Sequence, residues 1–234
     1  LIMSQRFQLY VLSICGLALL AAAGNAAEQD LPNSSGLFAR SNLVAWCIVP
    51  FDAKKRGPEA RAEMLARMGI FKFAYDWRAE HIPTFDEELD TLKRWKIELS
   101  AFWFPGALND EANAILEVLK RHNVKTELSV SQGYGDIQCT PEEHKQRVEA
   151  AVAALCPIVD AASAIGCKVG LYNHGGWFGV PENQIQIIEL LKQDGITNVG
   201  MVYTQHHGHG EIDRFAELFP KMKPHLLAIT LNGM

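Results

Sequence analysis

The sequence has few cysteines, and none of them stands in a spacing typical of metal or redox sites. The five are Cys15, Cys47, Cys139, Cys156 and Cys167, and no two form a CxxC pair. A zinc ribbon and a thioredoxin-like redox motif are therefore excluded. Cys47 and Cys167 lie within apolar runs, where a buried free thiol is expected, and no spacing indicates a disulfide.

Several catalytic signatures are also missing. The chain has no GxSxG, no P-loop and no GxGxxG after a predicted strand. These absences disfavour a serine nucleophile, phosphoryl transfer and nicotinamide chemistry. The net charge of −5 comes without a long basic run, so we expect no nucleic-acid partner.

Only one apolar run is long enough to interact with a membrane, and it lies near the start. Arg6 precedes residues 9–23 (LYVLSICGLALLAAA), and small residues follow at Ala26 and Ala27. This order predicts a signal peptide over residues 1–27, with an uncleaved anchor as the alternative. We therefore expect a protein exported to the periplasm or beyond, with no stable membrane span after cleavage and a linker over residues 28–40.

Short apolar runs recur through the rest of the chain, and helical patterns fill the intervals. The runs cover residues 43–49, 70–75, 97–104, 125–131, 167–173, 197–203 and 225–231. Their starts lie about 28 residues apart, except for one interval of about 42, which is typical of a parallel α/β sheet. The pattern predicts a (β/α)₈ TIM barrel over residues 41–234, with the chain apparently ending after strand 7. A doubly wound open sheet is the alternative.

One helix has a predicted start signal. Thr84 precedes residues 85–95, and Glu87 stands three positions later. This arrangement predicts a capping box with Thr84 as N-cap.

Alternate residues of the runs separate into a bulky apolar side and a small or polar side. The apolar side is expected to pack under helices, and the other side to face the barrel interior. Lys72, Glu98, Glu127 and Tyr172 fall on the interior side. Because buried charges are costly unless they are paired, we expect Lys72 to pair with Glu127 or with Glu98.

Barrel enzymes carry their reactive groups at the carboxyl ends of the strands. In this chain those ends combine polar and aromatic side chains, a composition that suits a polyhydroxylated ligand. The candidate ligand-binding residues are Asp76, Trp103, Tyr172, Asn173 and Asn232.

Two histidine-containing segments stand out at the same predicted edge. His174 follows strand 167–173, and His206, His207, His209 and Glu211 lie within residues 203–213 (YTQHHGHGEID). Imidazoles can bind a divalent metal or act as a general base. The alternatives are a glycine turn after a buried strand and a solvated Gly-His loop.

Residues 169–179 (VGLYNHGGWFG) resemble the strand-5 signature of the xylose isomerase-like TIM barrels, the sugar phosphate isomerase/epimerase superfamily. Residues 71–89 and 206–234 resemble exported bacterial members. The resemblance implies a divalent metal (Mn, Mg, Co or Zn) and proton transfer on a ketose, aldose or cyclitol. The expected partner is therefore a small-molecule sugar or sugar derivative.

The sequence departs from the superfamily pattern at the expected metal ligands. Tyr172 stands where many relatives have glutamate, Thr204 replaces an expected aspartate, and Asn232 stands where a histidine or aspartate is expected. His207 is retained. Most of the expected family ligands are therefore absent.

Two hypotheses follow. One is a sugar isomerase or epimerase with His174, His207, Glu127 and Lys72 as catalytic residues. Its metal ligands would then be His206, His209 and Glu211. The other is a catalytically degenerate barrel that binds carbohydrate or a protein partner. A nucleic-acid endonuclease of the same superfamily is disfavoured by export and acidic charge.

Overall fold

The computed structural model describes Gly36 and residues 39–231. The predicted signal peptide, most of the predicted linker and Asn232 lie outside the described residues, so these remain predictions. From Arg40 onward the described residues form one compact unit. No helix in this part of the chain has the length and hydrophobicity needed to cross a bilayer.

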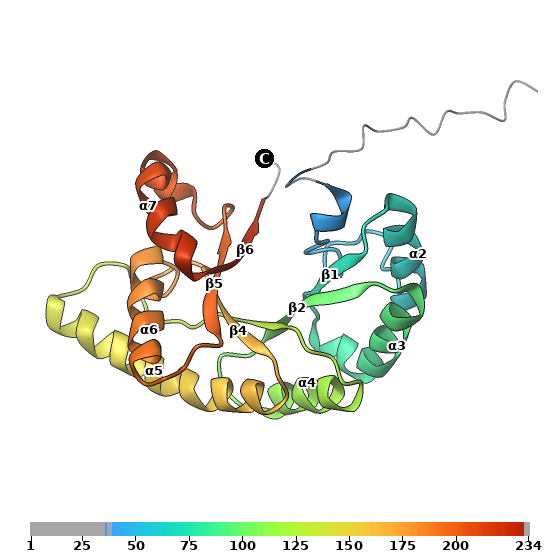
Figure 1. The fold of residues 1–234 in the computed structure, drawn as a ribbon, viewed down its shortest axis with the longest axis horizontal. Helices are drawn as coiled ribbons and strands as arrows, with labels where there is room; N and C mark the ends of the chain where they lie inside the picture. Colours follow the sequence, from blue (N-terminus) through green and yellow to red (C-terminus); the bar gives the residue numbers. More distant parts are fainter. Residues whose placement is uncertain (1–35, 37–38, 232–234) are drawn as a thin grey trace, which may run out of the picture. The chain divides into compact units, whose positions relative to one another are not determined.

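Six strands form one parallel sheet in the order β1-β2-β3-β4-β5-β6, which is also their order along the chain. The sheet curls, and the helices lie on its convex side (Figure 1). The strands are β1 (Lys72–Tyr75), β2 (Glu98–Phe104), β3 (Glu127–Val130), β4 (Lys168–Tyr172), β5 (Val199–Thr204) and β6 (Leu226–Thr230). A doubly wound sheet would reverse its strand order at a switch point. The unreversed order and the curl therefore confirm a barrel-type α/β fold, here a half-barrel.

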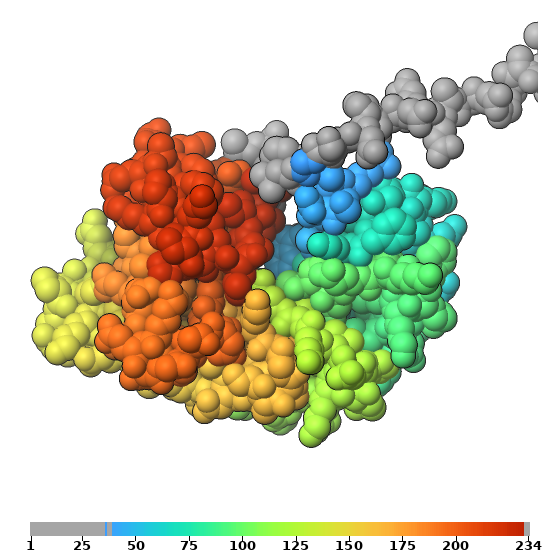
Figure 2. Space-filling model, in the orientation of Figure 1, coloured from blue at the N-terminus to red at the C-terminus, as the bar shows by residue number. Residues whose placement is uncertain are grey.

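The helices are α2 (Pro58–Met68), α3 (Phe85–Trp95), α4 (Asp110–Arg121), α5 (Pro141–Ala164), α6 (Pro181–Gln193) and α7 (Phe215–Met222). Short 3₁₀ turns are η1 (Arg40–Asn42), η2 (Ala79–Thr84), η3 (His209–Arg214) and η4 (Lys223–His225). Successive helices pack together, α2 on α3, α5 on α6 and α6 on α7. Figure 1 shows them outside the sheet, and Figure 2 shows the atoms of the same elements in the same orientation. The 24-residue helix α5 accounts for the long interval in the sequence.

The first predicted strand, residues 43–49, contributes only one bridge residue. Ala45 pairs with Phe73 in parallel orientation. Two residues later, Cys47 has a φ of 57°, in the left-handed region. An extended strand cannot continue through that conformation, so the prediction of a full strand here is wrong.

The predicted division of each strand into two sides is confirmed. The bulky members are fully buried under the helices, and they include Phe73, Tyr75, Leu128, Val130, Val169, Leu171, Met201 and Tyr203. Phe71 was expected among them, but it precedes β1 and is 46% exposed.

Two glycines make room on the concave side of the sheet. Gly170 on β4 and Gly200 on β5 are register partners. A Cβ at Gly170 would collide with the Glu127 carboxylate, and one at Gly200 would lie 2.6 Å from Cγ of Leu227. A Cβ at either position would force neighbouring atoms to shift, so glycine packs best there.

The predicted capping box at the start of α3 does not form. Thr84 is the N-cap residue, but its hydroxyl donates to the carbonyl of His81 at 2.9 Å instead of capping the helix. The preceding turn η2 brings that carbonyl within reach of the hydroxyl. A complete capping box is found at α5, where Thr140 and Glu143 satisfy each other's backbone N–H groups.

Candidate functional site

Aromatic side chains gather where the strands end at their carboxyl termini. Trp46 follows the Ala45 bridge, Trp103 lies near the end of β2 and Tyr172 is the last residue of β4. Their ring centroids are 6.3 Å apart for Trp46 and Trp103, 5.8 Å for Trp46 and Tyr172, and 4.9 Å for Trp103 and Tyr172. We call these three residues, with His174 and His207, the aromatic rim.

The two histidines extend the aromatic rim toward β5. His174 stacks on Tyr172 with an interplanar angle of 27°, and its centroid lies 6.0 Å from that of Trp103. His207 lies 4.5 Å from His174, centroid to centroid. Burial lowers the pKa of His207, and the nearby His174 and His206 lower it further. His207 is therefore a neutral imidazole at neutral pH, able to accept a proton.

Asn173 holds the strand ends that carry these histidines. Its amide nitrogen donates to the carbonyl of Thr204 at 3.1 Å, and its oxygen accepts from the Thr204 N–H at 2.7 Å. The side chain is 1% exposed. It was expected to contact a ligand, but both ends of its amide are used in tying β4 to β5. The structure gives it a positioning role.

The glycines after His174 turn the chain away from the sheet. Gly175 and Gly176 have φ values of 88° and 62°, which favour glycine. A Cβ on Gly176 would lie 3.0 Å from the carbonyl oxygen of Gly135. The N–H of Trp177 donates to that same carbonyl at 3.1 Å, which fixes the exit of the loop. Residues 170–179 are thus both a glycine turn and part of the aromatic rim.

Asp76 is a buried carboxyl group directly after β1. It is 3% exposed, and among the described residues neither carboxylate oxygen has a donor in full hydrogen-bond geometry, although the Cys47 thiol and the Val49 N–H lie close enough to favour its charged form. Burial raises its pKa to about 6, against smaller opposing effects that include Arg78, the Cys47 thiol and the Val49 N–H. Burial and the Asp76 charge together raise the pKa of Cys47 to about 12, so the thiol stays protonated and unreactive.

Two of the predicted catalytic residues lie at the other end of the strands. Lys72 is the first residue of β1 and Glu127 the first residue of β3, whereas the aromatic rim follows the last residues. Each strand residue adds about 3.3 Å, so these groups are not brought together with His174. Lys72 and Glu127 therefore lie away from the aromatic rim, and their catalytic role stays a prediction.

The charged residues predicted to lie in the interior pair only in part as expected, and Glu98 is exposed. The Lys72 ammonium lies 4.0 Å from the Glu98 carboxylate, one of the two predicted pairings. Glu127 instead accepts a hydrogen bond from the Ser129 hydroxyl at 2.7 Å. Burial raises the pKa of Glu127 to about 7, with the Ser129 hydrogen bond opposing it. No ion pair forms on Glu127 within the described part of the chain.

The predicted metal ligands do not converge. The rings of His206 and His209 lie 5.7 Å apart, and the Glu211 carboxylate is 3.2 Å from the Arg214 guanidinium. Among the residues that the structure describes, no group of three or more His, Cys, Asp or Glu side chains could hold a metal ion. Burial raises the pKa of Tyr172, so it is a neutral phenol where a carboxylate ligand was expected. The side chains present do not fit a divalent metal.

Trp46 was not among the residues predicted for this site. The run 43–49 was expected to be a regular strand, and Trp46 was counted only as one of its apolar residues. The left-handed backbone at Cys47 was not predictable from the run itself. Asp52, three residues after this run, has a structural role, because its carboxylate accepts from the Arg56 guanidinium at 2.6 Å and from the backbone N–H groups of Lys54 and Arg56.

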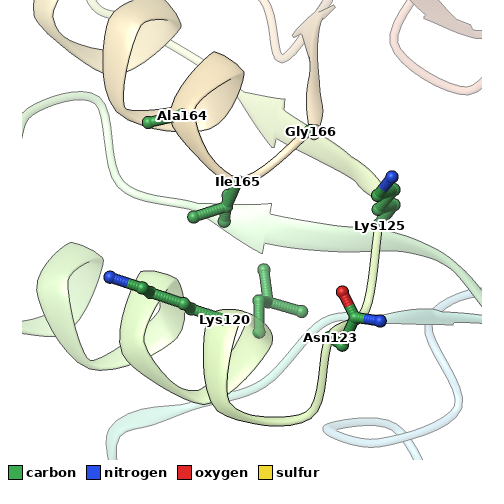
Figure 3. A pocket seen from close by; sticks show the side chains of 7 residues that line it. Lys120, Asn123, Lys125, Ala164, Ile165 and Gly166 are labelled. Atoms are coloured by element: carbon green, nitrogen blue, oxygen red, sulfur yellow. The ribbon is translucent and has the colours of Figure 1, made fainter.

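A hollow lies at the opposite ends of the strands from the aromatic rim. Figure 3 shows it where α4 and α5 end and where β3 and β4 begin. Its volume is about 330 Å³, and it is lined by Leu119, Lys120, Asn123, Lys125, Ala164, Ile165 and Gly166. Barrel enzymes have their catalytic residues at the carboxyl ends of the strands. This hollow lies at the amino ends, where residues usually contribute to stability.

No protein-family model and no curated protein matches the chain. Solved structures do match. A 3-keto-D-glucoside 4-epimerase from E. coli has a TM-score of 0.57 at 13% identity, over 80% of this chain and 76% of that one. A probable 3-DHS dehydratase from Bacillus anthracis has a TM-score of 0.56 at 15% identity, over 80% and 70%. A D-psicose 3-epimerase solved in the presence of D-fructose has a TM-score of 0.53 at 13% identity, over 74% and 67%.

The chain has the fold of these sugar-epimerase barrels. The predicted xylose isomerase-like TIM barrel is thus confirmed as a fold. The similar structures include epimerases and a dehydratase. Because these proteins catalyse different reactions, the shared fold does not identify the reaction of this chain.

Proposed function

We propose that this protein binds a sugar or sugar derivative at the aromatic rim. The observation that carries the proposal is the convergence of Trp46, Trp103 and Tyr172, with all three ring centroids within 6.3 Å of one another, at the carboxyl ends of the strands. Aromatic faces carry negative charge density, which attracts the weakly positive C–H face of a sugar ring. His174 and His207 add hydrogen-bonding groups beside that surface.

The structural neighbours support the same ligand class. Their names describe a 3-keto-D-glucoside epimerase and a D-psicose epimerase, the latter solved with D-fructose. Ligands of barrel proteins bind at the carboxyl ends of the strands, where the aromatic rim lies. We therefore take neutral hexoses and ketohexoses as the first ligands to test.

The proposal requires no metal. Tyr172, a neutral phenol, stands where the superfamily pattern has a carboxylate ligand, and no metal-holding group forms among the described residues. Sugar affinity is therefore expected to be the same with and without a chelator.

Calorimetric titration with D-fructose, D-psicose, D-tagatose and D-glucose tests the binding proposal. We expect Trp103→Ala to weaken the tightest of these about tenfold or more, because a desolvated aromatic contact is lost. Trp95→Ala is the matched control. Its indole lies on the outer helix α3, where it donates to Glu59 at 2.9 Å, far from the aromatic rim. Equal loss in both variants, or no binding to the unaltered protein, would contradict the proposal.

A second candidate function is epimerisation or isomerisation, favoured by the His174 and His207 pair at 4.5 Å. The neutral His207 imidazole can remove a proton from the carbon next to a carbonyl, while a ring N–H of His174 donates a proton to the carbonyl oxygen. The C–H electron pair becomes the C=C bond of an enediol. Reversal returns a proton to carbon, and return on the other face inverts that centre.

Solvent exchange separates catalysis from binding alone. In D₂O, a proton-transferring site incorporates deuterium at the carbon next to the carbonyl of a ketose, which NMR detects. We expect His207→Ala to abolish this exchange while Trp95→Ala preserves it. Absence of exchange for every ketose that binds would reject the catalytic function and leave the binding function intact.

A further inference from the structure

A second hollow adjoins the aromatic rim at the carboxyl ends of β1 and β2. Its volume is about 330 Å³, and it is lined by Trp77, Arg78, Ala79, Trp103, Pro105 and Glu111. Such a volume lies at the small end of the range for ligand pockets, about 300 Å³ and above. Trp103 belongs both to the lining of this hollow and to the aromatic rim, so the two surfaces adjoin at this residue.

The aromatic wall of the hollow is held in place by the protein. Trp77 is 6% exposed, and its indole N–H donates to the carbonyl of Trp103 at 2.7 Å. The Trp77 ring also packs edge-on against Phe85, with centroids 5.5 Å apart. This hydrogen bond links the end of β1 to the end of β2, so the wall is formed before any ligand arrives.

Two charged side chains of opposite sign complete the lining. One guanidinium nitrogen of Arg78 donates to the carbonyls of Asp76 and Trp77, at 2.9 Å and 2.7 Å. These hydrogen bonds orient the Arg78 guanidinium group and leave some of its N–H donors available. Glu111 lies in the first turn of α4. Within residues 39–231, neither Arg78 nor Glu111 forms an ion pair.

We propose that this hollow is a subsite for a second sugar ring, so that the preferred ligand is a disaccharide or glycoside. The inference rests on the proposed function, because it places the first ring on the aromatic rim. Indole surface suits the C–H face of a sugar, Arg78 donates to hydroxyl or ring oxygens, and Glu111 accepts from hydroxyls.

The charge balance favours a neutral ring over an anionic group. A phosphate or carboxylate in the hollow would gain from Arg78 but would be repelled by Glu111. A neutral polyol uses both, because its hydroxyls donate and accept at once. The two opposite charges of Arg78 and Glu111 therefore discriminate against sugar phosphates at this subsite.

Calorimetric titration with disaccharides and their component sugars tests the subsite. Sucrose, maltose and cellobiose are compared with D-glucose and D-fructose, and glucose 6-phosphate serves as the anionic probe. We expect at least one disaccharide to bind about tenfold more tightly than its components, the gain of charge-assisted hydrogen bonds in a partly enclosed site. Glu111→Gln should remove that gain and leave monosaccharide affinity unchanged. Glu117→Gln, an exposed change on the same helix, should preserve it.

The outcomes separate the subsite from the rim. If monosaccharides bind but no disaccharide binds more tightly, the subsite is wrong and the proposed function stands. If glucose 6-phosphate binds more tightly than every disaccharide and Glu111→Gln strengthens it further, the hollow is an anion site. If no sugar binds the unaltered protein, both proposals fall.

Discussion

Glu127 shows how a single residue can be placed correctly by sequence and still have an unexpected role. Strand alternation placed its side chain on the interior side of the sheet, and the structure has it there, lying across Gly170. Its expected cation, Lys72, pairs with Glu98 instead. One hydroxyl hydrogen bond does not offset the burial of a carboxylate, so the pKa rises to about 7.

This pKa predicts a pH-dependent stability. In the unfolded chain the carboxyl group ionises near its model value of 4.5, whereas in the folded protein it ionises near 7. The unfolded state thus loses its proton first, and the contribution of Glu127 to stability falls as the pH rises from about 4.5 through 7. Glu127→Gln cannot ionise, so it should be more stable than the unaltered protein at pH 8, by about 1–3 kcal/mol.

Urea unfolding at pH 4 and pH 8 measures this effect. At pH 4 the two proteins should differ little, since Glu127 is then protonated in both states. Glu98→Gln is the control, because Glu98 is exposed and contacts Lys72. A stability difference between Glu127→Gln and the unaltered protein that is equal at the two pH values would contradict the assigned pKa.

Among the structural elements, β4 and β5 depend on glycine for their inner face. Gly170 and Gly200 are opposite each other in the sheet, and the side chains of Glu127, Val202 and Leu227 occupy the space where their Cβ atoms would be. The same two strands carry His174 and His207 just beyond their ends. Their close packing therefore also fixes where the histidines lie.

Gly170→Ala is expected to destabilise the fold by about 1–3 kcal/mol, because the added methyl group overpacks the interior. Denaturant unfolding measures the loss, and Gly133→Ala is the control, since a Cβ there meets nothing within 4 Å. Adding Glu127→Ser to Gly170→Ala should recover part of the loss by removing the colliding carboxylate. A Gly170→Ala protein as stable as the control would show that this packing is not tight.

The elements were largely predictable from the sequence, but the connections between them were not. Periodicity located β1 to β6 and the helices, because strand and helix burial leave distinct patterns. It failed at residues 43–49, where the left-handed conformation of Cys47 interrupts the strand. It also failed at Thr84, whose hydroxyl was drawn to a backbone carbonyl of η2.

At the candidate site, the residue types were predictable and their grouping only in part. Trp103, Tyr172, His174 and His207 were correctly predicted to lie together, because parallel strands end at the same edge of the sheet. The alternation of side chains predicts which face of the sheet a residue lies on. It does not predict how far along its strand the residue lies from the groups at the carboxyl ends. For that reason Glu127 was predicted to be catalytic together with His174 and His207, although it lies at the opposite end of the strands.

At the scale of the whole compact unit, residues 40–231 form a half-barrel whose carboxyl-end edge carries every feature proposed to bind sugar. The aromatic rim and the Trp77–Glu111 hollow share Trp103. The Lys120–Lys125 hollow lies at the other edge. This separation follows from the parallel sheet, in which all strands end at one side and begin at the other, so that the two sides carry different residues.

A crystal structure after soaking with D-fructose and, separately, with a disaccharide tests the central claim most directly. We expect a sugar ring stacked on Trp103 or Tyr172 within hydrogen-bonding distance of His174, and the second ring of the disaccharide beside Trp77. Sugar density in the Lys120–Lys125 hollow alone, or an aromatic rim left empty at sugar concentrations that saturate binding in solution, would contradict it.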